Sequence, residues 1–142
     1  IKSNIVMMNL KKTKTVLQVR FNDLDMAGHV HNSEYLNYFE IGRIDFFNQV
    51  IDSNWDWKEK GILVARNEID YLKPTHFHDK IFVETACEDI GKKSITLSFK
   101  IFNDKEGVKE LCAKGRSILV CFDFNTNTSV AVFEEWKKSL ED

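Results

Sequence analysis

The feature that most constrains the fold is one apolar helix face followed by a long series of strand-like patterns. From about Ser33, residues suited to a buried face recur at spacings of three and four: Tyr35, Phe39, Gly42, Phe46 and Val50. This period predicts an amphipathic helix of about four to five turns. Gly42 costs about 1 kcal/mol of helix propensity relative to alanine, so we expect the helix to approach a sheet closely there.

After the predicted helix, the apolar period changes to two, which is typical of half-buried strands. Turn-forming residues at 74–79, 89–91 and 103–107 separate four such sets. The sets are Leu63, Ala65, Ile69 and Tyr71; Ile81, Val83, Thr85 and Cys87; Ile95, Leu97, Phe99 and Ile101; and Leu111, Ala113, Leu119 and Cys121. We also predict a strand from Val16 to Phe21 and a short helix from about Val132 to Leu140. This order indicates an α+β domain whose antiparallel sheet packs against one long helix.

The chain length favours a single domain over residues 1–142. One proline, six glycines and the lack of repeats leave no visible linker. We expect residues 1–14 to be flexible, or in part derived from an expression vector. One helix covers only one face of a sheet, so the remaining apolar surface favours self-association.

The composition excludes several classes of function. A formal net charge of -2 gives no broad positive field, so we expect no nucleic-acid partner. No apolar run reaches the roughly 20 residues of a membrane helix, and no signal-peptide pattern is present. Cys87, Cys112 and Cys121 form no CxxC pair, and we expect reduced thiols in a cytoplasmic protein.

Residues 20–35 combine a carboxylate, a glycine and the start of the predicted helix. Asp25 precedes the helix, Gly28 allows a sharp turn, and Asn32 or Ser33 is placed to cap the helix. Unpaired N–H groups and the positive end of the helix dipole can stabilise an oxyanion. A nearby carboxylate can attack a carbonyl or deprotonate a water molecule, so the parts suit acyl transfer to water. Asp-rich loops before helices also serve as caps and turns, and this is our interpretation of Asp23.

This stretch resembles the motif of the 4-hydroxybenzoyl-CoA thioesterase family, part of the hot-dog superfamily. The residues that match it in order are Arg20, Phe21, Asp23, Asp25, Gly28, His29, Val30, Asn32 and Tyr35. The similarity continues through residues 69–74, Asp79 and Phe122–Asp123. It therefore covers nearly the whole domain.

The resemblance implies a hot-dog fold, in which an antiparallel sheet wraps around one long central helix. It implies homodimers that join two sheets edge to edge, in some relatives paired into homotetramers, with active sites at the dimer interface. It further implies an acyl-CoA thioesterase that needs no cofactor, with Asp25 as nucleophile or general base. The helix N-terminus, with Gly28 and Asn32, becomes the expected oxyanion site. The candidate substrate-binding residues are His29, Ser33, Tyr35, Lys92 and Lys93.

The chain also departs from the family pattern. Some relatives carry a catalytic histidine at the place of Asn32. Asparagine cannot transfer a proton, so Asn32 could only orient a water molecule or the carbonyl group. His31 stands beside it. Residues 75–78 replace a commoner small residue and glycine. His76 and His78 lack a third plausible ligand, so no metal site is expected.

Two alternatives differ in class from a thioesterase. A non-catalytic hot-dog module would bind an acyl thioester or a partner protein, and an assay of hydrolysis separates the two. A hot-dog dehydratase is disfavoured by the position of Asp25 before the helix. The sequence leaves open the acyl group, the choice between coenzyme A and acyl carrier protein, and the choice between covalent and general-base catalysis.

Overall fold

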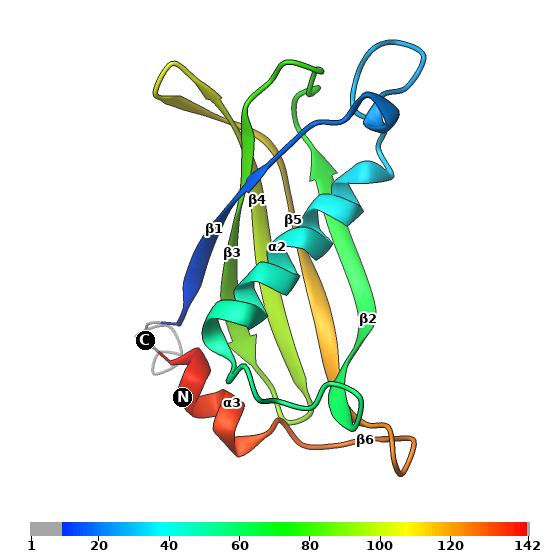
Figure 1. Cartoon of the computed structure of the whole chain (residues 1–142), viewed down its shortest axis with the longest axis vertical. Coiled ribbons are helices and arrows are strands. Elements are labelled where there is room, and N and C mark those ends of the chain that lie inside the picture. Colours follow the sequence, from blue (N-terminus) through cyan, green and yellow to red (C-terminus); the bar gives the residue numbers. More distant parts are fainter. Residues whose placement is uncertain (1–9, 142) are drawn as a thin grey trace.

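The computed structural model describes residues 10–141 and shows a curved antiparallel sheet with one long helix lying across it (Figure 1). The strand order is β1-β3-β4-β5-β2, with β6 beside β5. This architecture confirms the expected hot-dog fold. The elements are β1 (Lys12–Leu17), the 3-10 helix η1 (Phe21–Asp23), α2 (Glu34–Val50), β2 (Lys60–Tyr71), β3 (Ile81–Ile90), β4 (Ser94–Lys105), β5 (Val108–Asp123), β6 (Thr128–Ser129) and α3 (Glu134–Leu140).

Helix α2 packs on β1, β3 and β4 through a stripe wider than the predicted one. Its buried residues are Tyr35, Tyr38, Phe39, Gly42, Phe46 and Phe47, whereas Val50 is half-buried. A methyl group added at Gly42 would lie 2.7 Å from Thr85 Oγ1 and 2.8 Å from Val83 Cγ1. The close approach between helix and sheet that Gly42 predicted is therefore confirmed.

The space between α2 and the sheet is filled by aromatic rings. Phe39 stacks on Phe99 of β4, with ring centroids 4.7 Å apart and an interplanar angle of 9°. A methyl group on Gly115 of β5 would lie 2.7 Å from the Phe39 ring and would also strike the carbonyl oxygen of Glu68. Gly115 thus leaves room for the buried Phe39 ring.

The first strand begins earlier than the sequence predicted. β1 spans Lys12–Leu17, and Phe21 lies in η1 with 75% of its surface exposed. The prediction failed because the inward side chains of β1 include Thr13 and Thr15, which give no apolar alternation. Residues 12–14 of the segment expected to be flexible lie in this strand, and residues 1–9 lie outside the described part of the chain.

Strand β2 is present as predicted, but its expected apolar face is not buried. Leu63 and Tyr71 are exposed, and the pairing with β5 shifts register between Val64 and Arg66. That irregularity changes which side chains face the helix, so a strict period of two does not hold. Among residues 10–141, no strand pairs with the outer edge of β2.

The C-terminal helix α3 closes the far end of the core. Trp136 and Leu140 are buried there, which confirms the helix predicted from about Val132. Among residues 10–141, no helix has both the length and the apolar character needed to cross a bilayer.

Candidate active site

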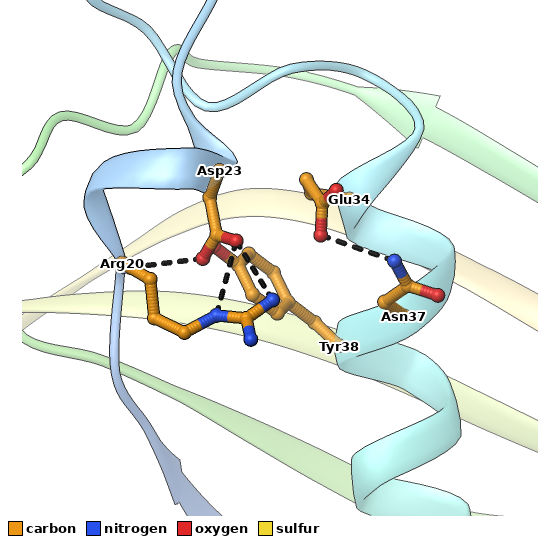
Figure 2. Close-up of polar contacts among 5 residues, drawn as sticks. All are labelled: Arg20, Asp23, Glu34, Asn37 and Tyr38. Atoms are coloured by element: carbon orange, nitrogen blue, oxygen red, sulfur yellow. Dashed lines mark hydrogen bonds and ion pairs between the residues drawn. The ribbon is translucent and has the colours of Figure 1, made fainter.

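A buried carboxylate fixes the chain just before the candidate loop. Asp23 is fully buried and accepts hydrogen bonds from the backbone N–H of Arg20 at 2.9 Å and the Tyr38 hydroxyl at 2.8 Å (Figure 2). The Arg20 guanidinium forms an ion pair with it at 3.1 Å. Burial alone would raise the pKa of Asp23, but these hydrogen bonds outweigh it and lower the pKa. Asp23 is therefore structural, as expected.

The loop after η1 presents Asp25 to solvent in a tight turn. Asp25 Oδ1 accepts hydrogen bonds from the backbone N–H groups of Ala27 at 2.9 Å and His29 at 3.1 Å. Gly28 has a φ of 80°, which favours glycine, and its N–H donates to the carbonyl oxygen of Asp25 at 3.1 Å. The turn holds one carboxylate oxygen, and no hydrogen bond from residues 10–141 reaches the other, Oδ2.

The Asp25 loop, the start of α2 and the end of β2 surround one hollow. Its volume is about 560 Å³, and it opens to solvent. The lining residues are Asp25, His29, Val30, His31, Asn32, Tyr35, Tyr71, Leu72, Lys73 and Pro74. Carboxylate, helix start and apolar walls thus meet in one place.

The start of α2 is capped differently from the prediction. Ser33 occupies the cap position but makes no side-chain cap bond, and Asn32 makes none either. The His31 ring accepts the Ser33 N–H through Nδ1 at 3.1 Å instead, and the Ser33 hydroxyl contacts the same nitrogen at 2.8 Å. His31 therefore holds the turn that leads into α2.

Two tyrosines form the wall of the hollow nearest the core. Tyr35 is buried and donates to Thr75 Oγ1 at 3.1 Å, and burial raises the pKa of its phenol. Tyr71 meets it edge to face at 5.3 Å and donates to the Asn32 carbonyl oxygen at 3.2 Å. The second bond ties the end of β2 to the start of α2.

His29 joins the Asp25 loop to the turn before β3. It forms an isolated antiparallel bridge with His76, and the two rings meet edge to face at 4.9 Å. Next to this bridge, the Val30 N–H donates to the Thr75 carbonyl oxygen at 2.8 Å. The loop is therefore anchored, next to Asp25, to the segment between β2 and β3.

Not every predicted site residue reaches the hollow. Asp25, Asn32, His29 and Tyr35 line it, whereas Gly28 and Ser33 shape the chain around it. Lys92 and Lys93 lie in the β3–β4 turn beside α3, at the opposite end of the sheet (Figure 1). Within one chain, these lysines are therefore not brought to the hollow.

The residues that sequence reasoning missed come from the end of β2 and the segment after it. Tyr71, Leu72, Lys73 and Pro74 line the hollow, and Lys73 pairs with Glu110 at 2.9 Å. The resemblance at residues 69–74 was the available signal, but no local spacing connects these residues with Asp25. Among residues 10–141, no group of three or more His, Cys, Asp or Glu side chains is placed to hold a metal ion.

Comparison with known proteins identifies the family. The profile of the thioesterase-like superfamily matches residues 19–140, which include the whole hollow. The chain belongs to this superfamily. It is accordingly a thioester hydrolase with a hot-dog fold.

Individual known proteins are similar to nearly the whole chain. The long-chain acyl-CoA thioesterase FadM of Escherichia coli is 28% identical, over 90% of this chain and 96% of its own. A thioesterase from Thermus thermophilus, solved with coenzyme A and Zn, is 30% identical, with a TM-score of 0.79 over 93% of this chain and 98% of its own. A 4-hydroxybenzoyl-CoA thioesterase complexed with 4-hydroxybenzoyl-CoA shares the fold at 14% identity, with a TM-score of 0.83 over 91% of this chain and 98% of its own.

Proposed function

We propose that this enzyme hydrolyses acyl-CoA thioesters in the hollow at the start of α2, with Asp25 as its catalytic carboxylate. The observation that carries the proposal is the position of Asp25, which lines the hollow with one oxygen held by two backbone N–H groups. A carboxylate fixed in this way needs little reorganisation before reaction. Coenzyme A as the carrier is supported by the similarity to the Escherichia coli and Thermus proteins.

Two reaction routes fit this arrangement. As a general base, Asp25 removes a proton from water, the resulting hydroxide attacks the thioester carbonyl, and the thiolate of coenzyme A leaves and takes up the proton from Asp25. As a nucleophile, Asp25 attacks the carbonyl itself and expels the thiolate, and water then cleaves the acyl anhydride. Both routes yield the free acid and restore the carboxylate.

The developing oxyanion requires N–H donors at the start of α2. The Gly28 N–H is already used within the turn, because it donates to the Asp25 carbonyl oxygen. The N–H of Asn32 has no hydrogen-bond partner among residues 10–141, and Asn32 lines the hollow. We assign the oxyanion site to Asn32 and the first turn of α2, with Gly28 shaping the loop that holds Asp25.

The acyl group is placed against the apolar part of the hollow. Val30, Tyr35, Tyr71, Leu72 and Pro74 supply this wall. The hollow is open beside β2, whose outer edge carries the exposed residues Leu63 and Val64. A second copy of the chain paired along this edge would bury these side chains and enclose the site, so we assign the active form to a homodimer.

Steady-state hydrolysis of a panel of acyl-CoA esters tests the proposal. Short, long and aromatic acyl groups are compared at equal concentration, and the release of free thiol is followed. We expect turnover of at least one class, with a KM that depends on the acyl group. Binding without turnover across the whole panel would instead support a non-catalytic module.

A further inference from the structure

The two peptide groups that flank Asn32 are each fixed by hydrogen bonds. In the peptide group before Asn32, the carbonyl oxygen of His31 accepts the N–H of Glu34 at 2.9 Å. In the peptide group after it, the Asn32 carbonyl oxygen accepts the Tyr71 hydroxyl at 3.2 Å. The N–H of this second peptide group belongs to Ser33 and donates to the His31 ring at 3.1 Å. Because peptide groups are planar, fixing both of them sets the two backbone dihedrals of Asn32 and the direction of its N–H.

Tyr71 is the contributor to this arrangement that comes from a distant part of the chain. The other contributors are sequence neighbours of Asn32, whereas Tyr71 is the last residue of β2. Its backbone is paired opposite Ala113 of β5. The hydrogen bond between Tyr71 and Asn32 therefore ties the position of Asn32 to the sheet.

The side chain of Tyr71 rests on a rigid support. Its ring meets the Tyr35 ring edge to face at 5.3 Å, and Tyr35 is itself buried and hydrogen-bonded to the fully buried Thr75 at 3.1 Å. The N–H groups of the two residues after Tyr71 both donate to the Cys112 carbonyl oxygen, at 2.8 and 3.0 Å. Ring and backbone are thus both held, so the hydroxyl of Tyr71 has a defined place beside Asn32.

The fold gains little from this hydroxyl. Tyr71 is 49% exposed, and both Tyr71 and Asn32 line the open hollow, where water can replace the bond between them. A hydrogen bond that is exchanged for bonds to water adds little to the free energy of unfolding. Phenylalanine at this position would keep the ring contact with Tyr35. The hydroxyl therefore has its clearest use in the site, where the N–H of Asn32 is the assigned oxyanion donor.

We propose that Tyr71 is a positioning residue, whose hydroxyl holds Asn32 so that the Asn32 N–H faces the developing oxyanion. This inference rests on the proposed thioesterase function and on the assignment of the oxyanion site to Asn32. A donor that is already in place needs no reorganisation when negative charge develops on the carbonyl oxygen. A shift of about 1 Å in such a group can cost about 100-fold in rate. Loss of the hydroxyl therefore slows the chemical step and leaves the binding of the acyl group unchanged.

The first test compares two variants of the full chain that each lose one side-chain hydroxyl. Tyr71→Phe keeps the ring in the wall of the hollow, and we expect kcat to fall by about 10-fold or more, with KM within about twofold of the wild type. Ser117→Ala is the control, because the Ser117 hydroxyl donates to Asn67 Oδ1 of β2 at 2.6 Å, away from the hollow. Its kcat and KM should both stay within about twofold of the wild type, as expected for a change remote from the reacting groups. Both variants are assayed with one acyl-CoA substrate, and their thermal unfolding is recorded.

A second test asks whether Tyr71 acts through Asn32. Asn32→Pro removes the N–H and should lower kcat by about 100-fold, as for the loss of one oxyanion donor. If Tyr71 works by directing that N–H, adding Tyr71→Phe to Asn32→Pro should change kcat by less than about twofold. A merely structural role of the hydroxyl would instead lower kcat by the same factor with and without the Asn32 N–H.

Each other outcome has a defined meaning once thermal unfolding shows that the variants are folded. A kcat of Tyr71→Phe close to that of the wild type overturns the positioning role and leaves the thioesterase assignment intact. Equal factors in the two backgrounds also overturn it, and a raised KM with unchanged kcat would assign the hydroxyl to substrate binding instead. If Asn32→Pro does not fold, the effects of Tyr71→Phe on kcat and KM decide alone.

Two results would reach beyond Tyr71. A folded Asn32→Pro variant with a kcat close to that of the wild type would remove the Asn32 N–H from the oxyanion site, and the positioning role would fall with it. A wild-type protein that hydrolyses no acyl-CoA would refute the proposed function itself.

Discussion

Replacing Asp25 with asparagine is the sharpest test of the catalytic assignment. The side chain sits in an exposed turn, where Oδ1 accepts two backbone N–H groups and Oδ2 makes no hydrogen bond within residues 10–141. Asparagine keeps an acceptor oxygen for both N–H groups but removes the negative charge. The turn should therefore survive, and only the chemistry that needs a carboxylate should be lost.

The expected effects on rate and on stability follow from the proposed catalytic role of Asp25 and from its role in the turn. A positioned acid–base group contributes about 100-fold to 10,000-fold in rate, so kcat should fall by at least about 100-fold. That factor corresponds to about 2.7 kcal/mol in the activation barrier. The change in stability should be smaller, because exposed substitutions usually alter the free energy of unfolding by about 0.5 kcal/mol.

A matched control separates an effect on catalysis from the general effect of removing the charge of a carboxylate that holds a turn. Asp123 Oδ1 also accepts two backbone N–H groups, from Asn125 at 2.8 Å and Thr126 at 3.3 Å, but it lies outside the hollow. Asp123→Asn should leave kcat within about twofold, as expected for a change away from the reacting groups. Both variants are assayed with one acyl-CoA substrate, and their thermal unfolding is recorded.

The reasoning fails if Asp25→Asn retains more than about a tenth of the wild-type kcat while remaining folded, because a positioned acid–base group is worth more than that. It also fails if Asp123→Asn loses activity to the same extent. The carboxylate at position 25 would then be a turn residue, and the catalytic group would have to be sought elsewhere in the hollow.

Three further outcomes follow from the structure. Gly28→Val forces a β-branched residue to a φ of 80° and should lower kcat by about 100-fold. Asparagine tolerates this backbone conformation, so Gly28→Asn should keep a kcat close to that of the wild type. Similar kcat values for the two variants would show that the conformation of this loop does not matter for catalysis. Asp23→Asn should lower the free energy of unfolding by about 1–3 kcal/mol. Because folding lowers the Asp23 pKa, its stabilisation is complete above the unfolded value of about 3.9 and disappears as pH falls through the folded pKa. Unfolding of both proteins from neutral to acidic pH should therefore show converging stabilities, and a constant gap would contradict this account. Light scattering should show a homodimer, and Val64→Lys on the open edge of β2 should produce monomers with reduced kcat; an unchanged dimer would place the interface elsewhere.

The elements whose apolar residues recur at a regular local spacing could be predicted from the sequence. The spacing of Tyr35, Phe39 and Phe46 predicted α2, and Gly42 within it predicted the close contact with the sheet. The start of β1 was not predictable in the same way, since threonines on its inner face do not stand out as core residues. The shift of register near Val64 likewise depends on pairing with a strand about 50 residues away in the chain.

The candidate site likewise combines residues that are close in sequence, which could be predicted, with residues that only the fold brings together. Asp25, His29 and Asn32 are near one another in sequence, so the motif alone placed them around the start of the helix. Tyr71 reaches Asn32 only because β2 ends beside α2, a contact between residues 39 positions apart. Lys92 and Lys93 show the converse case, because a basic turn cannot be placed in the fold until the length and direction of β3 are known.

The stacked Phe39 ring limits where an acyl tail can go. Phe39 follows Tyr35 by one turn of α2, stacks on Phe99 and is buried close to Gly115. We therefore expect the buried Phe39 ring to stop a tail that enters past Tyr35. On the proposed function, longer tails would run along the surface beside β2, so we expect selectivity for chain length to depend on that surface rather than on the depth of a tunnel through the core.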